Sequence, residues 1–353
     1  MGPYLQSHGE FTKKAFLNGR IDLSQAEAVI ELINSKTEKE AEASINQLEG
    51  YLKKEIDNIK AVILEIMTDI EASIDYPEYD IEEVTNSKAL SKLDEIELKL
   101  EKLEKSFKNG KIIREGIKTA IIGTPNAGKS SLLNAILKED RAIVTEFEGT
   151  TRDTIEEFIT INGIPLKIID TAGIRDAQDE VEKIGIKKSK EIAQNSDLVI
   201  AIFDSTKKLT QKDKEILEII KNKKSIIIIN KIDLGKVEIE KEYLKKYGKS
   251  IIEISALNKQ GIDVLYNEIS KIFDLNDVNL NDGITITNIR HLELIKKAKN
   301  YAIKAKETIK NNMPIDIIAI DIKEIIESLN TITGENATED IINEIFKKFC
   351  LGK

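Results

Sequence analysis

The sequence contains one cysteine, five prolines and no tryptophan. It also lacks the run of about 18 apolar residues that a membrane-spanning helix needs, and its N-terminus lacks the basic and then apolar order of a signal peptide. A single cysteine cannot form an intramolecular disulfide, so we expect the reducing environment of the cytoplasm. The formal net charge of −9 disfavours broad, non-specific binding to nucleic acid. A protein with this net charge can still carry a local basic face.

Charged residues make up 33% of the 353 residues and apolar residues 41%, a composition typical of soluble, helix-rich proteins. A single hydrophobic core rarely extends beyond about 250–300 residues, so we expect two or three domains.

Both ends of the chain are predicted to be helical. Residues 24–75 should form one or two long helices, because apolar residues recur there at steps of three and four. We interpret this stripe as the core of a helical domain; it comprises Leu48, Leu52, Ile56, Ile59, Ile63, Ile66 and Ile70. Pro77 interrupts the pattern. A second amphipathic helix is predicted over 86–109 with Gly110 as its C-cap. Residues 292–348 are also predicted to be helical.

Short apolar segments typical of strands fill the middle of the chain. Residues 117–123 predict a strand, and residues 158–169 predict a hairpin around Asn162 and Gly163. Residues 198–203 and 226–229 are continuous apolar runs, as in strands buried on both faces of a parallel sheet. We therefore predict an α/β domain at 116–275, inserted into a helical domain that is formed by 1–115 and 276–353.

Residues 123–130 read Gly-Thr-Pro-Asn-Ala-Gly-Lys-Ser, which fits the phosphate-binding pattern G-x-x-x-x-G-K-[ST] between a predicted strand and a predicted helix. In such a loop the backbone N–H groups point at the phosphates, close to a helix N-terminus. Lys129 should reach the β- and γ-phosphates, and Ser130 should bind magnesium. The alternative is a chance glycine-rich turn, and the flanking strand and helix argue against it.

Three further segments, each at a strand end, complete the pattern of a guanine-nucleotide site. In the segment 170–173, Asp170 should hold the magnesium shell and the Gly173 N–H should meet the γ-phosphate. In the segment 230–233, Asp233 can accept two hydrogen bonds from guanine, and 255–257 can supply an N–H to its oxygen. Together these motifs predict a Ras-like P-loop GTPase domain. The GTP-contacting residues that they indicate are Ala127, Gly128, Lys129, Ser130, Asp170, Thr171, Ala172, Gly173, Asn230, Lys231, Asp233, Ser255, Ala256 and Leu257.

The motifs do not identify the group that orients the attacking water. Ras-type GTPases use a glutamine two residues after the glycine of D-x-x-G, and this sequence has Ile174 and Arg175 after that glycine. An apolar Ile174 cannot orient water. Arg175 and the acidic residues up to Glu182 are candidates, and a solvated acidic loop is the alternative.

Several more segments carry a family resemblance. The sequence reads Gly-Glu-Phe-Thr at 9–12, Phe-Leu-Asn-Gly-Arg at 16–20 and Gln-Ala-Glu-Ala-Val at 25–29. It also has Gly-Thr-Thr-Arg-Asp at 149–153, Asp-Glu-Val-Glu at 179–182 and a terminal Cys-Leu-Gly-Lys. With these segments the chain resembles the MnmE (TrmE) family of tRNA-modification GTPases over nearly its whole length. The GTPase motifs occur in many families, whereas the first and last segments are specific to this one.

The resemblance implies further roles around the nucleotide. It implies a potassium ion where other GTPases use an arginine finger, with the ligands Asn126, Thr145, Phe147 and Thr150. It implies that Thr151 joins Ser130 on magnesium and that Glu182 orients the attacking water, with Arg175 as a second catalytic candidate. The additional GTP contacts that it implies are Asn126, Ser131, Thr145, Glu146, Phe147, Glu148, Gly149, Thr150 and Thr151.

The resemblance also implies partners. Family members dimerise through their G domains in a nucleotide-dependent way. They act with an FAD-containing partner of the MnmG (GidA) type to modify carbon 5 of the wobble uridine in certain tRNAs. They also carry a folate-binding domain, of which residues 1–20 resemble only the exit segment. Arg20 and Lys353 match folate contacts, so we expect a tetrahydrofolate derivative to bind only if the missing domain is supplied. Cys350 is interpreted as a functional thiol and not as a small buried hydrophobe.

Two other functions fit parts of the sequence. A ribosome-assembly GTPase of the Era or Der type shares the central motifs, but residues 276–353 show neither a KH-type G-x-x-G loop nor a second P-loop. A truncated remnant that binds GTP without full modification activity is the other alternative. The presence of Asn126, Thr151 and Glu182 argues against decay of the GTP site.

Overall fold

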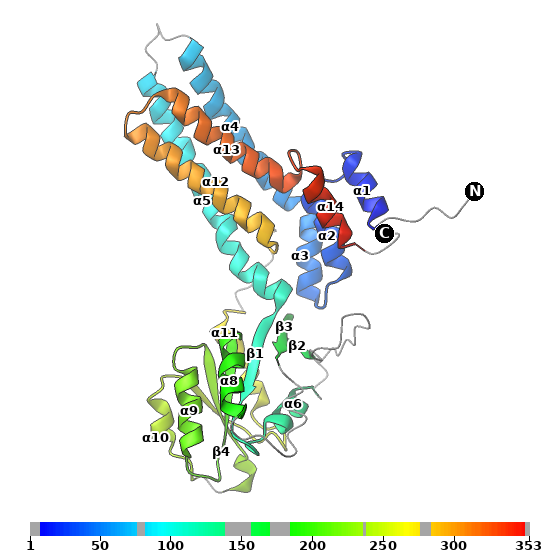
Figure 1. Ribbon diagram of the computed structural model, residues 1–353, viewed down its shortest axis with the longest axis vertical. Coiled ribbons are helices and arrows are strands. Elements are labelled where there is room, and N and C mark those ends of the chain that lie inside the picture. Colours follow the sequence, from blue (N-terminus) through cyan, green and yellow to red (C-terminus); the bar gives the residue numbers. More distant parts are fainter. Residues whose placement is uncertain are drawn as a thin grey trace, which may run out of the picture. The chain divides into compact units, whose positions relative to one another are not determined.

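The computed structural model describes residues 8–75, 82–137, 157–169, 184–235, 238–275 and 284–349. The chain forms two compact units, which Figure 1 shows as a group of helices and a sheet with helices around it. The helical unit comprises Met1–Arg114 and Leu280–Lys353, and the G unit comprises Glu115–Asn279. No helix in the described ranges is long and apolar enough to cross a membrane.

The first part of the helical unit contains four helices before residue 76. Their bounds are α1 (Glu10–Leu17), α2 (Leu23–Ile33), α3 (Glu38–Leu48) and α4 (Tyr51–Asp75). Asp22 and Gln25 form a reciprocal capping box at the start of α2, and Thr37 caps α3. Gly50, with φ 86°, separates α3 from α4. The prediction of one or two helices over 24–75 was therefore wrong, because two breaks interrupt the apolar periodicity.

Helix α5 (Glu82–Glu115) extends beyond the predicted range 86–109. Gly110 lies inside this helix, so its predicted role as a C-cap was wrong. A Cβ at Gly110 would lie 2.0 Å from the carbonyl oxygen of Ile286, so glycine permits a close approach of the two backbones. The helix ends before Gly116, which has φ +72°.

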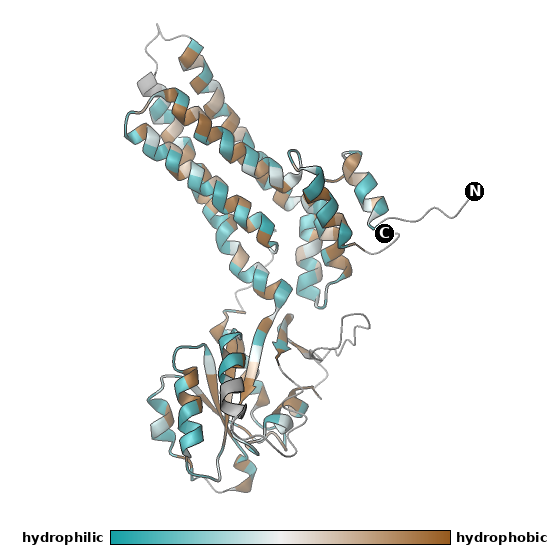
Figure 2. Cartoon of the chain, viewed as in Figure 1, coloured by the Kyte–Doolittle hydropathy of each residue, from teal (hydrophilic) through white to brown (hydrophobic). Residues whose placement is uncertain are grey.

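The predicted return of helical structure after residue 292 is confirmed. It consists of α12 (Ile289–Lys310), α13 (Ile315–Thr333) and α14 (Glu339–Lys347). Residues of α4, α5, α12 and α13 share one hydrophobic core, and the predicted stripe is buried in it from Leu52 to Ile70, whereas its first member, Leu48, ends α3 and is half-buried. Apolar and polar residues alternate along these helices in Figure 2, as expected for helices with one buried face.

The G unit is built on a six-stranded sheet in the order β2-β3-β1-β4-β5-β6. β2 pairs with β3 in antiparallel fashion, and the other neighbours pair in parallel. The strands are β1 (Ile117–Ile122), β2 (Glu157–Ile161), β3 (Ile164–Ile168), β4 (Leu198–Asp204), β5 (Ser225–Asn230) and β6 (Ser250–Glu253). The predicted hairpin is confirmed, and its turn residues Asn162 and Gly163 have φ 50° and 78°. The short edge strand β6 precedes the segment 255–257, which was expected at a strand end, although the bounds of this strand were not predicted.

Helices connect the parallel strands of the G unit. The described ones are α6 (Lys129–Leu137), α8 (Ile184–Gln194), α9 (Gln211–Ile220), α10 (Lys241–Lys245) and α11 (Ile262–Ile272), with a short 3₁₀ helix, η2 (Ile232–Leu234). The predicted fold class, an α/β domain together with an all-α domain, is confirmed. Parallel strands bring their carboxyl ends to one edge of the sheet, where ligands of such folds bind.

Candidate nucleotide site

The loop between β1 and α6 contains the predicted phosphate-binding sequence. Asn126 has φ 62° and Gly128 has φ 106°, so two positions of the loop adopt left-handed backbone conformations. Gly128 must lack a side chain, because a Cβ there would lie 2.0 Å from Asn230 Nδ2. Helix α6 begins at Lys129, directly after the loop. The unpaired N–H groups of its first turn therefore follow the loop, an arrangement that favours phosphate.

The Lys129 ammonium turns back over this loop. Its Nζ donates hydrogen bonds to the carbonyl oxygens of Gly123 and Thr124, each at 2.9 Å. Burial lowers the pKa of Lys129, because removal from water disfavours the charged form. An anionic phosphate at the loop would compensate for that loss of hydration. The loop thus contains a half-buried cation suited to an anionic ligand.

The side-chain amide of Asn230 connects two loops of the site. Its Nδ2 donates a hydrogen bond to the carbonyl oxygen of Ala127 at 3.0 Å. Its Oδ1 accepts one from the Ala256 N–H, also at 3.0 Å. Asn230 is only 2% exposed, so its donor and acceptor are both matched within the protein. This residue therefore ties the phosphate loop after β1 to the loop after β6.

The predicted base-reading residues lie in the loops after β5 and β6. Asp233 is exposed within η2, and its Oδ1 accepts a hydrogen bond of 2.6 Å from Ser255 Oγ. Ser255 Oγ in turn accepts the N–H of Asn258 at 3.2 Å. Within the predicted segment 255–257, Asn230 takes the N–H of Ala256 and Gln260 that of Ser255, so the Leu257 N–H is the one without an acceptor among the described residues. It is therefore the better candidate for a donor to a ligand.

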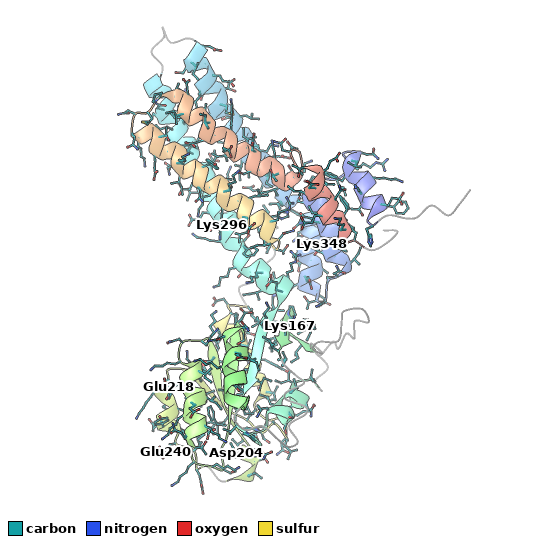
Figure 3. The ribbon with its side chains drawn as sticks, in the orientation of Figure 1. Lys167, Asp204, Glu218, Glu240, Lys296 and Lys348 are labelled. Atoms are coloured by element: carbon teal, nitrogen blue, oxygen red, sulfur yellow. The ribbon has the colours of Figure 1, made fainter. Side chains whose placement is uncertain are left out.

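Sequence reasoning missed an acidic residue that fixes Lys231. Asp204, labelled in Figure 3, ends β4, and its Oδ2 lies 2.6 Å from Lys231 Nζ. Burial raises the pKa of Asp204, but hydrogen bonds from Lys231 and Thr206 outweigh burial and lower it. Lys231 itself has φ 67°. The signal available in the sequence was the position of Asp204, an acidic residue at the end of a continuous apolar strand.

A second missed contact reaches the phosphate loop from α9. Thr124 Oγ1 donates a hydrogen bond of 3.1 Å to Asp213 Oδ1. The other carboxylate oxygen of Asp213 accepts the N–H and hydroxyl of Thr210, the residue that caps α9. The first turn of α9 and the phosphate loop are thereby joined through one buried carboxylate.

Several predicted site residues lie outside the described part of the chain. They are Thr145, Glu146, Phe147, Glu148, Gly149, Thr150 and Thr151, then Asp170, Thr171, Ala172 and Gly173, then Arg175 and Glu182, and finally Cys350 and Lys353. Ser131 is described and exposed in the first turn of α6.

The predicted folate and thiol positions occur near the two ends of the chain. Arg20 is exposed between α1 and α2. His8 Nδ1 lies 2.6 Å from the carbonyl oxygen of Phe349, the residue before Cys350. The N-terminal segment therefore packs against the end of the described C-terminal segment. No group of three or more His, Cys, Asp or Glu side chains suited to a metal occurs among the described residues.

Comparison with known proteins identifies the family. A family model described as the MnmE helical domain matches residues 23–350. The chain belongs to the MnmE family. A relative from Clostridioides difficile, named tRNA modification GTPase MnmE, is 49% identical over 351 residues, which cover 99% of this chain and 76% of the relative. An MnmE relative of the same name from Acetivibrio thermocellus is 50% identical over 354 residues, covering 100% of this chain and 77% of the relative.

Among solved structures, the G domain of the T. maritima FeoB iron transporter is 25% identical to this chain. The match covers 44% of this chain and 98% of that domain, with a TM-score of 0.33.

Proposed function

We propose that this chain is a potassium-stimulated GTP hydrolase that takes part in the C5 modification of tRNA wobble uridine. The observation that carries the proposal is the single hydrogen-bonded assembly of the phosphate loop, Asn230 and the Ser255 loop at the carboxyl ends of β1, β5 and β6. The names of the MnmE relatives, tRNA modification GTPases, support GTP hydrolysis and a role in tRNA modification.

Phosphate binding falls to the loop at 123–130. The backbone N–H groups of this loop and of the first turn of α6 attract the phosphate oxygens. Lys129 supplies the positive charge, and it must exchange its bonds to Gly123 and Thr124 for bonds to phosphate. The site prefers an anion because burial disfavours the lone ammonium.

Guanine recognition falls to Asp233. Its exposed carboxylate can accept two hydrogen bonds from the guanine edge, whereas adenine lacks the matching donors. Ser255 holds Oδ1 of this carboxylate and thereby limits its rotation. The Leu257 N–H is the corresponding donor for the guanine oxygen. A site of this kind discriminates because the wrong base leaves polar groups unpaired.

The oxygen donors near the phosphate loop fit hard cations. The Ser130 hydroxyl, together with Thr151, would hold magnesium. Asn126, which is exposed in the phosphate loop, would join Thr145, Phe147 and Thr150 around potassium. When bound, these cations would neutralise charge at the γ-phosphate. Glu182 then orients the attacking water, and Arg175 assists at the same switch segment.

The proposed partners and cofactor are those that membership of the MnmE family suggests. The partners proposed are tRNA, an FAD-containing protein of the MnmG type and a second copy of this chain, which associates through the G unit when nucleotide is bound. A tetrahydrofolate derivative is proposed to contact Arg20 and Lys353.

The test is GTP turnover by the purified chain in potassium and in sodium at equal ionic strength. We expect at least a tenfold higher rate in potassium, which corresponds to about 1.4 kcal/mol of transition-state stabilisation. The control variant is Glu182→Ala, which should lower kcat by a factor on the order of 10² while GTP affinity stays nearly constant. GTP binding without turnover in either salt would identify a nucleotide-binding remnant instead, and equal rates in both salts would contradict the potassium site.

A further inference from the structure

Helix α2 carries two acidic residues, Glu27 and Glu31, that are one turn apart and therefore lie on the same face. Both side chains are almost completely buried, with 7% and 9% of their surface exposed. A buried carboxylate is stable only when other groups compensate for its lost hydration. The groups that compensate these two carboxylates come from distant parts of the sequence.

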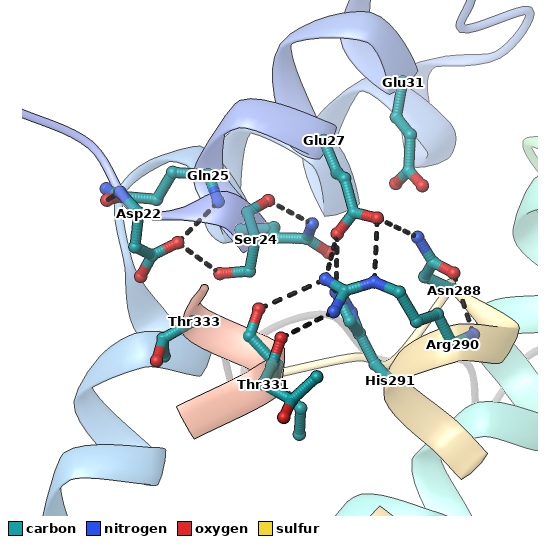
Figure 4. Close-up of polar contacts among 12 residues, drawn as sticks. Asp22, Ser24, Gln25, Glu27, Glu31, Asn288, Arg290, His291, Thr331 and Thr333 are labelled. Atoms are coloured by element: carbon teal, nitrogen blue, oxygen red, sulfur yellow. Dashed lines mark hydrogen bonds and ion pairs between the residues drawn. The ribbon is translucent and has the colours of Figure 1, made fainter. Parts of the chain in front are cut away.

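Glu27 binds the start of α12. Its Oε2 lies 2.7 Å from Arg290 Nη2 and 2.8 Å from His291 Nε2. Its Oε1 accepts hydrogen bonds from Asn288 Nδ2 and Arg290 Nε, both at 3.1 Å. Figure 4 shows these side chains converging on the carboxylate from α12. Arg290 also donates to the carbonyl oxygen of Thr331 at 2.8 Å, so the same guanidinium reaches the end of α13.

Glu31 binds the end of α5 and the segment that precedes α12. Its Oε1 forms an ion pair of 3.0 Å with Arg114 Nη1, and its Oε2 accepts a hydrogen bond of 3.1 Å from Thr287 Oγ1. Burial raises the pKa of Glu31, and Arg114 opposes that shift.

These partners occupy the two places where the chain passes between the helical unit and the G unit. The chain leaves the helical unit after Arg114 and returns at Leu280. Arg114 is thus the last residue before the first crossing, and Thr287 to His291 are the first residues with described side-chain contacts to α2 after the second. Residues next to both crossings therefore form buried polar contacts with the face of α2 that carries Glu27 and Glu31.

Helix α2 also packs on the C-terminal helix. Leu23 and Ala26 share a hydrophobic cluster with Ile345, Phe346 and Phe349 of α14 and the residues directly after it. Helix α2 therefore contacts the crossings through charged groups and contacts α14 through apolar groups.

We propose that α2 transmits the nucleotide state of the G unit to α14, with Glu27 and Glu31 as the positioning residues that fasten it to both crossings. This inference rests on the proposed GTPase function. A displacement of either crossing must move α2 or break a buried ion pair, and breaking one leaves an uncompensated charge in the interior. Movement of α2 is therefore the less costly response, and α14 moves with it because well-packed side chains transmit strain.

The test uses hydrogen exchange on the full chain with GDP and with GDP plus aluminium fluoride, which imitates the transition state. In the native chain we expect the exchange rates of α2 and α14 to differ at least fivefold between the two states. In Glu31→Gln and Arg114→Gln the difference at α14 should fall below twofold, while the protection of residues 123–130 by nucleotide stays unchanged. Glu42→Gln, an exposed carboxylate on the adjacent α3, is the matched control and should behave like the native chain.

The outcomes separate this inference from the proposed function. If nucleotide fails to protect residues 123–130 in the native chain, both are wrong. If it protects them and α14 does not respond, or if α14 still responds in both variants, only the coupling through α2 is wrong. Arg114→Lys retains the charge and should restore at least half of the response at α14, which a general loss of stability would not permit.

Discussion

The amide of Asn230 is bonded on both sides, to the Ala127 carbonyl oxygen and to the Ala256 N–H, at 3.0 Å each. Asn230→Ala would leave both backbone groups without a partner, at a cost of about 1–3 kcal/mol for each buried group. We expect GDP affinity to fall at least tenfold and the G unit to unfold at a lower temperature. Fluorescent-nucleotide titration and calorimetry would measure the two effects. Asn258→Ala, at an exposed position of the neighbouring turn, should change neither.

Asp233→Asn should change the base that the site accepts. The substitution removes a charged acceptor of two hydrogen bonds, so GTP binding should weaken by about 2–4 kcal/mol. Xanthosine triphosphate, whose edge is complementary to an amide, should bind the variant better than the native chain. Competition titrations with both nucleotides test this, and unchanged GTP affinity would show that the 230–233 segment does not read the base.

Glu27 should make the helical unit sensitive to acid. Burial alone raises the pKa of this carboxyl, but His291 and Arg290 outweigh burial and lower it from 4.5 to about 2. A depressed carboxyl pKa stabilises the fold above the unfolded pKa, and the stabilisation is lost as the pH falls through the folded value. The loss should therefore develop between pH 4.5 and about 2 and be on the order of 3 kcal/mol. Urea unfolding followed by circular dichroism would measure it, and Glu27→Gln should abolish this part of the pH dependence.

The pKa of Glu31 is shifted in the opposite direction to that of Glu27, so the two residues should have opposite effects on the pH dependence of stability. Its pKa is raised by burial, so the folded state binds its proton more tightly than the unfolded state does. Stability from this group is therefore lost as the pH rises above the ordinary value for glutamate. In the same unfolding series, Glu31→Gln should remove that loss, and equal pH profiles for the two glutamine variants would contradict both assignments.

Gly110→Ala should destabilise the helical unit although alanine is the better helix former. Helix propensity alone predicts a gain of about 1 kcal/mol. The new Cβ would lie 2.0 Å from the Ile286 carbonyl oxygen, and forcing the backbones apart should cost about 1–3 kcal/mol more than that gain. Thermal unfolding would decide between the two effects. Asn109→Ala, one residue earlier, gains propensity without this contact and should not destabilise.

The sequence predicted best those features that depend on residues close together in the chain. The loop at 123–130, the hairpin at Asn162 and Gly163, and the apolar stripe of α4 depend on neighbouring residues, so periodicity and motif spacing could predict them. Short breaks between helices were harder to predict, because the breaks at Thr37 and Gly50 depend on single residues within a long helical range.

Contacts between distant segments could not be predicted from one sequence. Glu27 and His291 are 264 positions apart, and nothing local marks either as a partner of the other. The role of Gly110 depends on Ile286 in the same way. The Asp204–Lys231 and Thr124–Asp213 contacts likewise required the sheet order, since each joins residues at or beyond the ends of different strands.

The division of the helical unit into Met1–Arg114 and Leu280–Lys353 has a consequence during synthesis. Helices α4 and α5 emerge from the ribosome first, but the apolar residues of α12 and α13 that complete their core emerge only after the whole G unit. At about 5–20 residues per second, this interval is on the order of ten to thirty seconds. During that time the G unit can fold alone, while the nascent helices expose an apolar face that a chaperone would bind.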